Sequence, residues 1–190
     1  MPFFYISLFS LLLLMTISII YNTIKLGISP MPSSSTAFKA VSQLIDESST
    51  GTVVDLGCGW GNLVIRLARR YPQRQVIGYE LSLLPWLTTK IIRKCLGLKN
   101  LTLYKQDFYK ADFYEASLLI CYLEPKAMHK IEKKLAEQPG KVNYLISNNF
   151  ALPTWTPVKV IRLNDFYKSP VYIYRVKRPP NKCISNIPVL

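Results

Sequence analysis

The sequence predicts an α/β fold: a doubly wound sheet of seven strands that closes with a C-terminal antiparallel hairpin and is preceded by one transmembrane helix. Short apolar runs alternate with segments of helical periodicity, which is typical of parallel strands joined by helices. No helical pattern separates the last two apolar runs, Val158–Leu163 and Val171–Val176, so these should pair as the hairpin. The transmembrane helix is expected because the first 24 residues carry no charged side chain.

The N-terminal segment, residues 1–24, has the length and polarity of a membrane anchor. Phe3 to Tyr21 is apolar apart from scattered Ser and Thr. Nineteen residues at about 1.5 Å each span roughly 29 Å, the thickness of a bilayer's hydrocarbon core. The basic start and the cleavage site of a signal peptide are missing. Lys25 and Lys39 follow, which favours a single-pass membrane protein with a cytoplasmic domain, in a bacterial inner membrane or, in a eukaryote, the mitochondrial inner membrane.

A linker rich in Pro and Ser, residues 25–35, joins this anchor to the domain. Its length would keep the domain within roughly 30 Å of the bilayer. An amphipathic helix is expected over residues 36–47, packed on the edge of the sheet. The domain should run from residue 36 to residue 177, before a flexible tail of residues 178–190. The apolar face of the first helix comprises Ala37, Ala40, Val41, Leu44 and Ile45.

The most informative stretch is a strand that runs into three glycines. Thr52–Leu56 has the apolar pattern of a buried parallel strand and contains Asp55, and Gly57, Gly59 and Gly61 follow at two-residue spacing. Glycines allow a tight turn whose backbone can approach a ligand closely. Helical periodicity then resumes. A strand, a glycine turn and a helix open a Rossmann-like nucleotide-binding unit.

Two further strands are each followed by an acid. Val76–Tyr79 leads into Glu80, which is placed to accept hydrogen bonds from both hydroxyls of a ribose. Leu101–Tyr104 is followed by Asp107, for which a turn-capping role is the alternative. The helix between these strands should begin at Ser82. Its expected buried stripe is Leu84, Leu87, Ile91 and Cys95.

The second half of the domain continues the alternation. Ser117–Tyr122 is the fourth strand and ends in Glu124, and a helix over residues 126–138 should pack through Ala127, Ile131 and Leu135. Val142–Ser147 is the fifth strand.

The composition narrows the function classes. The chain has 190 residues, a net charge of +13 and one histidine, His129, which lies off the apolar stripe of its helix and so argues against an imidazole base. Cys58, Cys95, Cys121 and Cys183 form no C-x-x-C pair, which favours buried reduced thiols over a zinc site. Lys and Arg are dispersed, so the charge fits anionic lipid as well as nucleic acid.

The motif D-x-G-x-G-x-G followed by a second acid resembles the class I S-adenosylmethionine-dependent methyltransferases. The resemblance implies S-adenosylmethionine as the cofactor, with the adenine held at Asp107 and Phe108. A nucleotide fold whose site has decayed is the alternative. The cofactor-binding residues that the resemblance implies are Asp55, Gly57, Cys58, Gly59, Gly61, Glu80, Leu81, Asp107, Phe108 and Tyr122.

Three stretches resemble one narrower family of protein lysine methyltransferases: Tyr79-Glu80-Leu81 with Pro85-Trp86, the helix that contains Met128, and Phe150 to Pro157. Mitochondrial members of that family act on the c-ring protein of ATP synthase and on the adenine nucleotide translocase. It also has bacterial relatives, and its enzymes carry an N-terminal hydrophobic segment. This chain departs from the family where Cys58 and Trp60 replace an expected Ser and Asp.

These observations lead to the hypothesis of an N-methyltransferase that modifies a lysine of a membrane protein, with the lipid bilayer as a second partner and with neither a metal nor a nucleic acid. Tyr122, Phe150 and Trp155 would form an aromatic pocket for the amine, the last two as substrate-pocket residues. Glu124 is the candidate catalytic residue that would orient the amine, and a simple helix-start acid is the alternative. The other hypotheses are a nucleic-acid methyltransferase and a non-catalytic membrane assembly factor.

Overall fold

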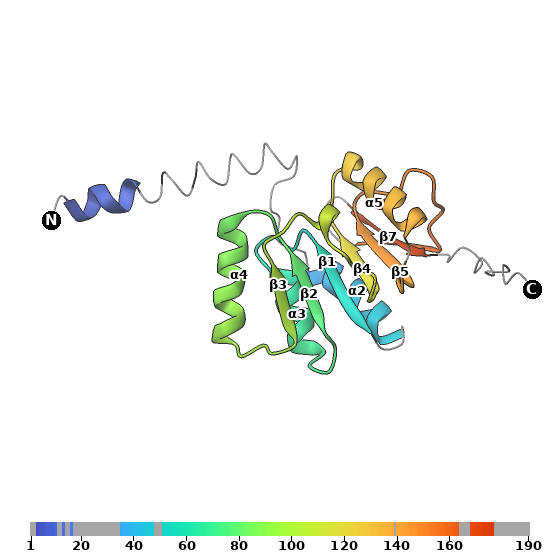
Figure 1. Ribbon diagram of the computed structural model, residues 1–190, viewed down its shortest axis with the longest axis horizontal. Helices are drawn as coiled ribbons and strands as arrows, with labels where there is room; N and C mark the ends of the chain where they lie inside the picture. Colours follow the sequence, from blue (N-terminus) through green and yellow to red (C-terminus); the bar gives the residue numbers. More distant parts are fainter. Residues whose placement is uncertain are drawn as a thin grey trace, which may run out of the picture.

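The computed structural model describes residues 3–10, 13, 16, 35–47, 51–138, 140–163 and 168–176. Within this part of the chain, seven strands form one sheet in the order β3-β2-β1-β4-β5-β7-β6 (Figure 1). The strands are β1 (Thr52–Leu56), β2 (Val76–Tyr79), β3 (Leu101–Tyr104), β4 (Ala116–Cys121), β5 (Tyr144–Asn148), β6 (Lys159–Arg162) and β7 (Pro170–Arg175). The helices are α2 (Ser35–Glu47), α3 (Asn62–Arg70), α4 (Leu83–Cys95), the short 3-10 helix η1 (Phe108–Lys110) and α5 (Pro125–Glu137).

The sheet topology confirms the predicted α/β architecture. β1 pairs in parallel with β2 on one side and with β4 on the other, and β5 continues in parallel beyond β4. β7 runs antiparallel to both β5 and β6, as the predicted hairpin requires. The chain adds strands on one side of β1 and then crosses to the other, which creates a switch point between β1 and β4. In open α/β sheets, ligands bind at the carboxyl ends of the strands at such a point.

Helices cover both faces of the sheet because successive strand residues point to opposite sides. Val53 packs in one apolar cluster with residues of α2 and α3, whereas Val54 packs in a second cluster with residues of α5. Figure 1 shows α5 and the pair α2 and α3 on opposite sides of the sheet. Both faces are therefore buried, which explains why the strands are apolar at successive positions.

α2 lies beside α3 on a face of the sheet, and not at its edge as predicted. Val41 and Ile45 of α2 are buried in the same cluster as Ile146 of β5. The hydroxyl of Tyr71, just after α3, donates to Oδ1 of Asp46 at 2.8 Å. The central strands present apolar side chains on this face that α3 alone does not cover, so α2 buries more surface here than it would at an edge.

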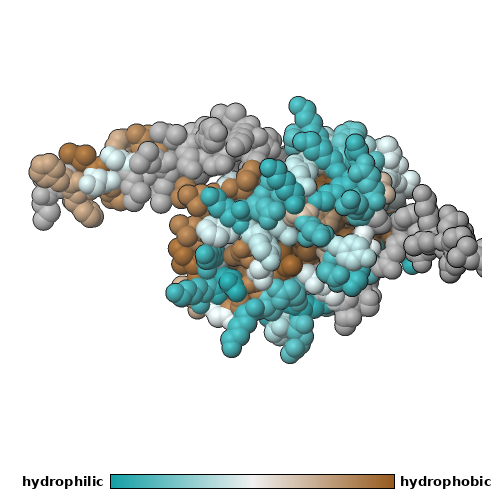
Figure 2. Space-filling view, in the orientation of Figure 1, coloured by the Kyte–Doolittle hydropathy of each residue, from teal (hydrophilic) through white to brown (hydrophobic). Residues whose placement is uncertain are grey.

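α4 packs differently from its prediction. Its buried residues are Pro85 and Thr89. A Cβ at Gly61 would clash with the side chain of Thr89, so the helix approaches the glycine turn closely, with a small side chain at the contact. That approach turns the apolar stripe outward, which Figure 2 shows as a hydrophobic area on the side where α4 lies. The members of the predicted stripe are exposed or half-buried: Leu84, Leu87, Ile91 and Cys95.

The predicted membrane anchor lies largely outside the described residues. Residues 3–10, 13 and 16 are helical, and no helix within the described ranges is long and apolar enough to cross a bilayer. Of the predicted linker, only residue 35 is described, as the first residue of α2, and the tail of residues 178–190 lies wholly outside the description. The anchor, linker and tail therefore stay predictions.

Candidate functional site

The turn after β1 is held against the end of β2. The backbone amides of Gly57 and Cys58 both donate to the carbonyl oxygen of Tyr79, at 3.0 and 2.8 Å. The φ angles of Gly57, Gly59 and Gly61 are 90°, 53° and 76°, in the region that side-chain-bearing residues rarely adopt. The spacing of the three glycines in the sequence therefore reflects three backbone positions that need them.

Gly57 leaves open space beside this turn. A Cβ at Gly57 would meet Cδ2 of Leu123 at 3.5 Å, which is an ordinary van der Waals contact, whereas the Cβ position at Gly61 is already filled by Thr89. Gly57 is also exposed. A ligand can consequently approach the backbone of Gly57 at the switch point of the sheet.

Glu80 connects the loops that follow β1 and β2. Its side chain is buried, its Oε2 accepts a hydrogen bond from the amide of Gly59 at 2.8 Å, and its Oε1 accepts one from the amide of Ser82 at 2.7 Å. A carboxylate offers about four acceptor positions. Two remain after these bonds, so Glu80 can hold the turn and still accept the hydroxyls of a ribose. Leu81, between the two loops, is exposed.

A second buried acid lies next to Glu80. Burial, and then the negative charge of Glu80, raise the pKa of Asp55 from 3.8 to about 7. Burial and the same two carboxylates raise the pKa of the Cys58 thiol well above 9, so this thiol stays protonated at neutral pH and is a poor nucleophile. No salt bridge to either acid occurs in the described chain. Two close carboxylates without a cationic partner favour a positively charged ligand.

Asp107 and Glu124, which follow different strands, both lie near Tyr109. Oδ1 of Asp107 accepts a hydrogen bond from the amide of Tyr109 at 2.9 Å and so caps η1, the turn role considered above. Burial, and then the charges of Asp107 and Glu124, raise the pKa of Tyr109 to about 12. The ring of Phe108 lies 4.4 Å from that of Tyr109. Glu124 precedes α5 without capping it through its side chain.

Two of the three predicted pocket aromatics come together. The rings of Tyr122, after β4, and Phe150, after β5, are 6.0 Å apart at an angle of 36°. Nδ2 of Asn149 lies 3.5 Å from the hydroxyl of Tyr122, and Asn149 has a φ of 69°. Trp155 is half-buried against the apolar cluster of α5. The aromatic group thus borders the same edge of the sheet as the glycine turn.

The segment that carries Phe150 and Trp155 is fastened by two residues that the sequence analysis did not single out. Glu132 is buried in α5 and accepts hydrogen bonds from the amide and the hydroxyl of Thr154, at 3.0 and 2.7 Å. The hydroxyl of Tyr174, in β7, accepts one from the amide of Leu152 at 2.9 Å. The detectable signal was an acid on the buried stripe of α5, since a charged residue there needs a partner.

Asn148 was also missed. It ends β5 at the carboxyl edge of the sheet, and its Oδ1 is buried with no hydrogen-bond partner in the described chain. Buried polar atoms are nearly always paired, so an unpaired oxygen at this edge is a candidate acceptor for a bound ligand. Its signal was positional: Glu80 and Asp107 were identified because they follow strands, and the same rule applies to Asn148.

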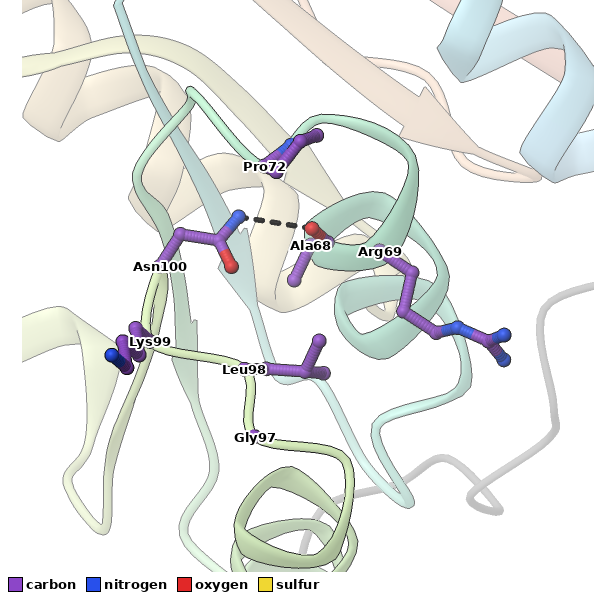
Figure 3. A pocket seen from close by; sticks show the side chains of 7 residues that line it. All are labelled: Ala68, Arg69, Pro72, Gly97, Leu98, Lys99 and Asn100. Atoms are coloured by element: carbon purple, nitrogen blue, oxygen red, sulfur yellow. Dashed lines mark hydrogen bonds between the residues drawn. The ribbon is translucent and has the colours of Figure 1, made fainter.

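A hollow of about 540 Å³ lies elsewhere, at the amino ends of β2 and β3 (Figure 3). Its lining includes Arg69 and Lys99, but its central polar group, the amide of Asn100, already donates to the carbonyls of Ala68 and Tyr71 at 3.0 Å each. This hollow is a junction between α3 and the start of β3, and it contains none of the residues described above.

Comparison with known proteins agrees with this geometry. Residues 55–159 match a family described as the ANTKMT methyltransferase domain. The chain is 32% identical over 136 residues to the lysine N-methyltransferase of the ATP synthase c-ring protein from Xenopus laevis, which covers 70% of this chain and 58% of that protein. It is 31% identical over 114 residues to the adenine nucleotide translocase lysine N-methyltransferase of Mus musculus, covering 58% and 48%. The chain therefore spans about half the length of these relatives.

Two other similarities cover more of the matched protein. A protein-lysine N-methyltransferase of Saccharolobus islandicus is 24% identical over 152 residues, which is 76% of this chain and 91% of that protein. Among solved structures, an RNA methyltransferase from Salinibacter ruber in complex with S-adenosyl-L-homocysteine superposes with a TM-score of 0.68 at 24% identity, covering 80% of this chain and 97% of that one. At this identity the superposition establishes a shared fold.

Proposed function

The chain belongs to the ANTKMT methyltransferase family, and from this membership we propose that it transfers the methyl group of S-adenosylmethionine to a lysine side chain of a membrane protein. The observation that carries the proposal is the pair of buried carboxylates, Asp55 and Glu80, beside the open glycine turn. This arrangement suits a ligand that combines a ribose with positive charge.

The cofactor fits the residues that the described chain offers. Glu80 has acceptor positions left for the ribose hydroxyls, and Gly57 leaves room for close approach. Asp107 keeps one carboxylate oxygen for the adenine amino group after capping η1. When bound, S-adenosylmethionine supplies an activated methyl group. The protein then has to present a neutral amine in line with it.

Neutralising the acceptor is the main demand on the site. A free lysine has a pKa near 10.4, so its deprotonation at pH 7.4 costs roughly 4 kcal/mol. An apolar, aromatic surround such as Tyr122 and Phe150 would lower that cost by disfavouring the ammonium form, while ring faces attract the cation beforehand. The unpaired Oδ1 of Asn148 and the carboxylate of Glu124 are the acceptors that would orient the amine.

A membrane-held substrate is supported by two features. The relatives named above act on lysines of the ATP synthase c-ring protein and of the adenine nucleotide translocase. The predicted anchor, residues 1–24, and the short predicted linker would confine the domain to the cytoplasmic surface of a bilayer, which raises the effective concentration of membrane proteins over soluble ones.

The test is to incubate the purified full chain with tritium-labelled S-adenosylmethionine and detergent-solubilised membranes. Label should enter a protein band, and mass spectrometry should place it on lysine. Glu80→Gln should lower cofactor affinity roughly tenfold, since a hydrogen bond to a charged acceptor contributes about 1.5–3 kcal/mol. Glu137→Gln, an exposed acid at the end of α5, is the matched control.

Label that entered RNA would support the nucleic-acid alternative, which the net charge of +13 favours, and would contradict the lysine proposal. Failure to bind the cofactor by calorimetry would favour the non-catalytic assembly factor.

A further inference from the structure

α4 carries a stripe of apolar side chains that no described element covers. Leu83, Leu87 and Ile91 follow one another at four-residue spacing, so they lie on one face of the helix, and they are 51%, 41% and 55% exposed. Cys95 continues the same row and is exposed. Leu81, just before the helix, extends it toward the glycine turn. We call these five residues the α4 face, and Figure 2 shows hydrophobic surface on this side of the molecule.

The packing of α4 gives this face no structural purpose. The helix is fixed to the domain through Pro85 and Thr89, the latter pressed against Gly61. Rotating the stripe inward would replace Thr89 by a leucine or isoleucine at a contact that leaves no room. An apolar row that stays outside for this reason marks an interaction site when its surroundings suit a partner.

The surroundings of the α4 face are basic. Lys90, Arg93 and Lys94 lie in the same helix, which contains no acid. Nζ of Lys90 lies 4.6 Å from the ring centre of Trp86, whose Nε1 is buried and has no hydrogen-bond partner in the described chain. An apolar row flanked by Lys, Arg and a tryptophan is the pattern of helices that lie in the headgroup region of anionic membranes. A second copy of the same face would oppose like charges.

We propose that the α4 face docks on an anionic lipid bilayer. Leu81 and Leu83 lie on either side of Ser82, whose amide is bound by Glu80, so docking through them would bring the cofactor edge of the sheet to the membrane surface. This contact goes beyond the proposed function, because it orients the domain whatever group is methylated. It is also separate from the predicted anchor, which limits distance but not orientation.

Cys95 provides the test, because its native thiol lies on the α4 face while Cys58 and Cys121 are buried. The full chain with Cys183→Ser is labelled at Cys95 with an environment-sensitive fluorophore. It is then reconstituted into phosphatidylcholine vesicles with or without phosphatidylglycerol. The matched control carries the fluorophore at Lys133→Cys, on an exposed position of α5, with Cys95→Ser and Cys183→Ser.

The expected result is a blue-shifted emission from the Cys95 probe that grows with phosphatidylglycerol and is quenched by lipids with a spin label on the acyl chain. The probe at position 133 should show neither effect, although the same N-terminal segment tethers both proteins. Lys90→Gln with Lys94→Gln should return the Cys95 signal toward its value in pure phosphatidylcholine.

Two outcomes would overturn the proposal. In one, both probes behave alike, so the domain has no preferred orientation. In the other, the Cys95 emission shifts with the protein-to-lipid ratio and is not quenched by the spin-labelled lipid, which would mean that a second copy of the chain covers the face. Loss of labelling in RNA or protein assays would test the proposed function but would leave this fluorescence result unchanged.

Discussion

α4 and α5 have the same length, 13 residues, and both cover the sheet, yet they use their apolar residues in opposite ways. α5 buries Met128, Ile131 and Leu135, whereas α4 exposes Leu87 and Ile91. α5 packs on central strands that offer a wide apolar surface. α4 packs near the edge strand β3 and against a glycine turn that admits only small side chains. Apolar periodicity therefore predicts a helix, but the partner surface decides which side is buried.

The largest expected effect distinguishes the two helices directly. Ile131→Ala in α5 should cost about 2–5 kcal/mol because it leaves a cavity in the core. At about 2–4 °C per kcal/mol for a chain of this size, the melting temperature should fall by roughly 5 °C or more. Ile91→Ala in α4 should stay within about 0.5 kcal/mol of the wild type. Thermal unfolding of both variants in mild detergent measures the difference, and equal losses would mean that α4 is packed after all.

The second prediction concerns the acids beside α4. The pKa of Asp55 is raised from 3.8 to about 7, so between these pH values the folded state holds a proton that the unfolded state has lost. Stability from this group is therefore lost as pH rises from about 4 to about 7, by at most about 4 kcal/mol. Asp55→Asn should remove that loss and gain on the wild type with rising pH. Melting temperatures at pH 5 and pH 8 test this, and a gap that stayed constant would contradict it.

A third test probes the contact that turns α4 outward. Gly61→Ala places a Cβ against the side chain of Thr89 and also strains a φ of 76°, so it should destabilise by about 1–3 kcal/mol. Adding Thr89→Ala should restore part of this, because it removes the clash and leaves the strain. Gly57→Ala is the control with strain but with space. A double variant no more stable than Gly61→Ala would show that Thr89 is not the obstacle.

The smallest effect is expected in the half of the sheet that α5 covers. Glu132→Gln keeps the shape but loses the charge that holds Thr154, so it should weaken the loop by about 1 kcal/mol. Methyl transfer should fall severalfold while cofactor affinity stays unchanged, since the loop lies on the acceptor side. Glu137→Gln should change neither. A loss of cofactor affinity in Glu132→Gln would instead indicate a general effect on the fold.

The elements that follow local rules could be predicted from the sequence. The positions of the strands, the hairpin and the three glycines were all predictable, because apolar runs, turn residues and backbone conformation depend on near neighbours in the chain. The strand-end rule also identified Glu80, which the structure buries between two loops. It would have identified Asn148 had it been applied to β5.

How the elements meet depends on the tertiary structure. The outward stripe of α4 follows from the contact between Gly61 and Thr89, residues on different elements. The role of Glu132 follows from a loop that reaches it 22 residues later. Tyr109 came to lie beside Glu124 through the docking of η1 near α5. Each of these depends on the approach of segments that are distant in the chain, and periodicity within one segment carries no information about that approach.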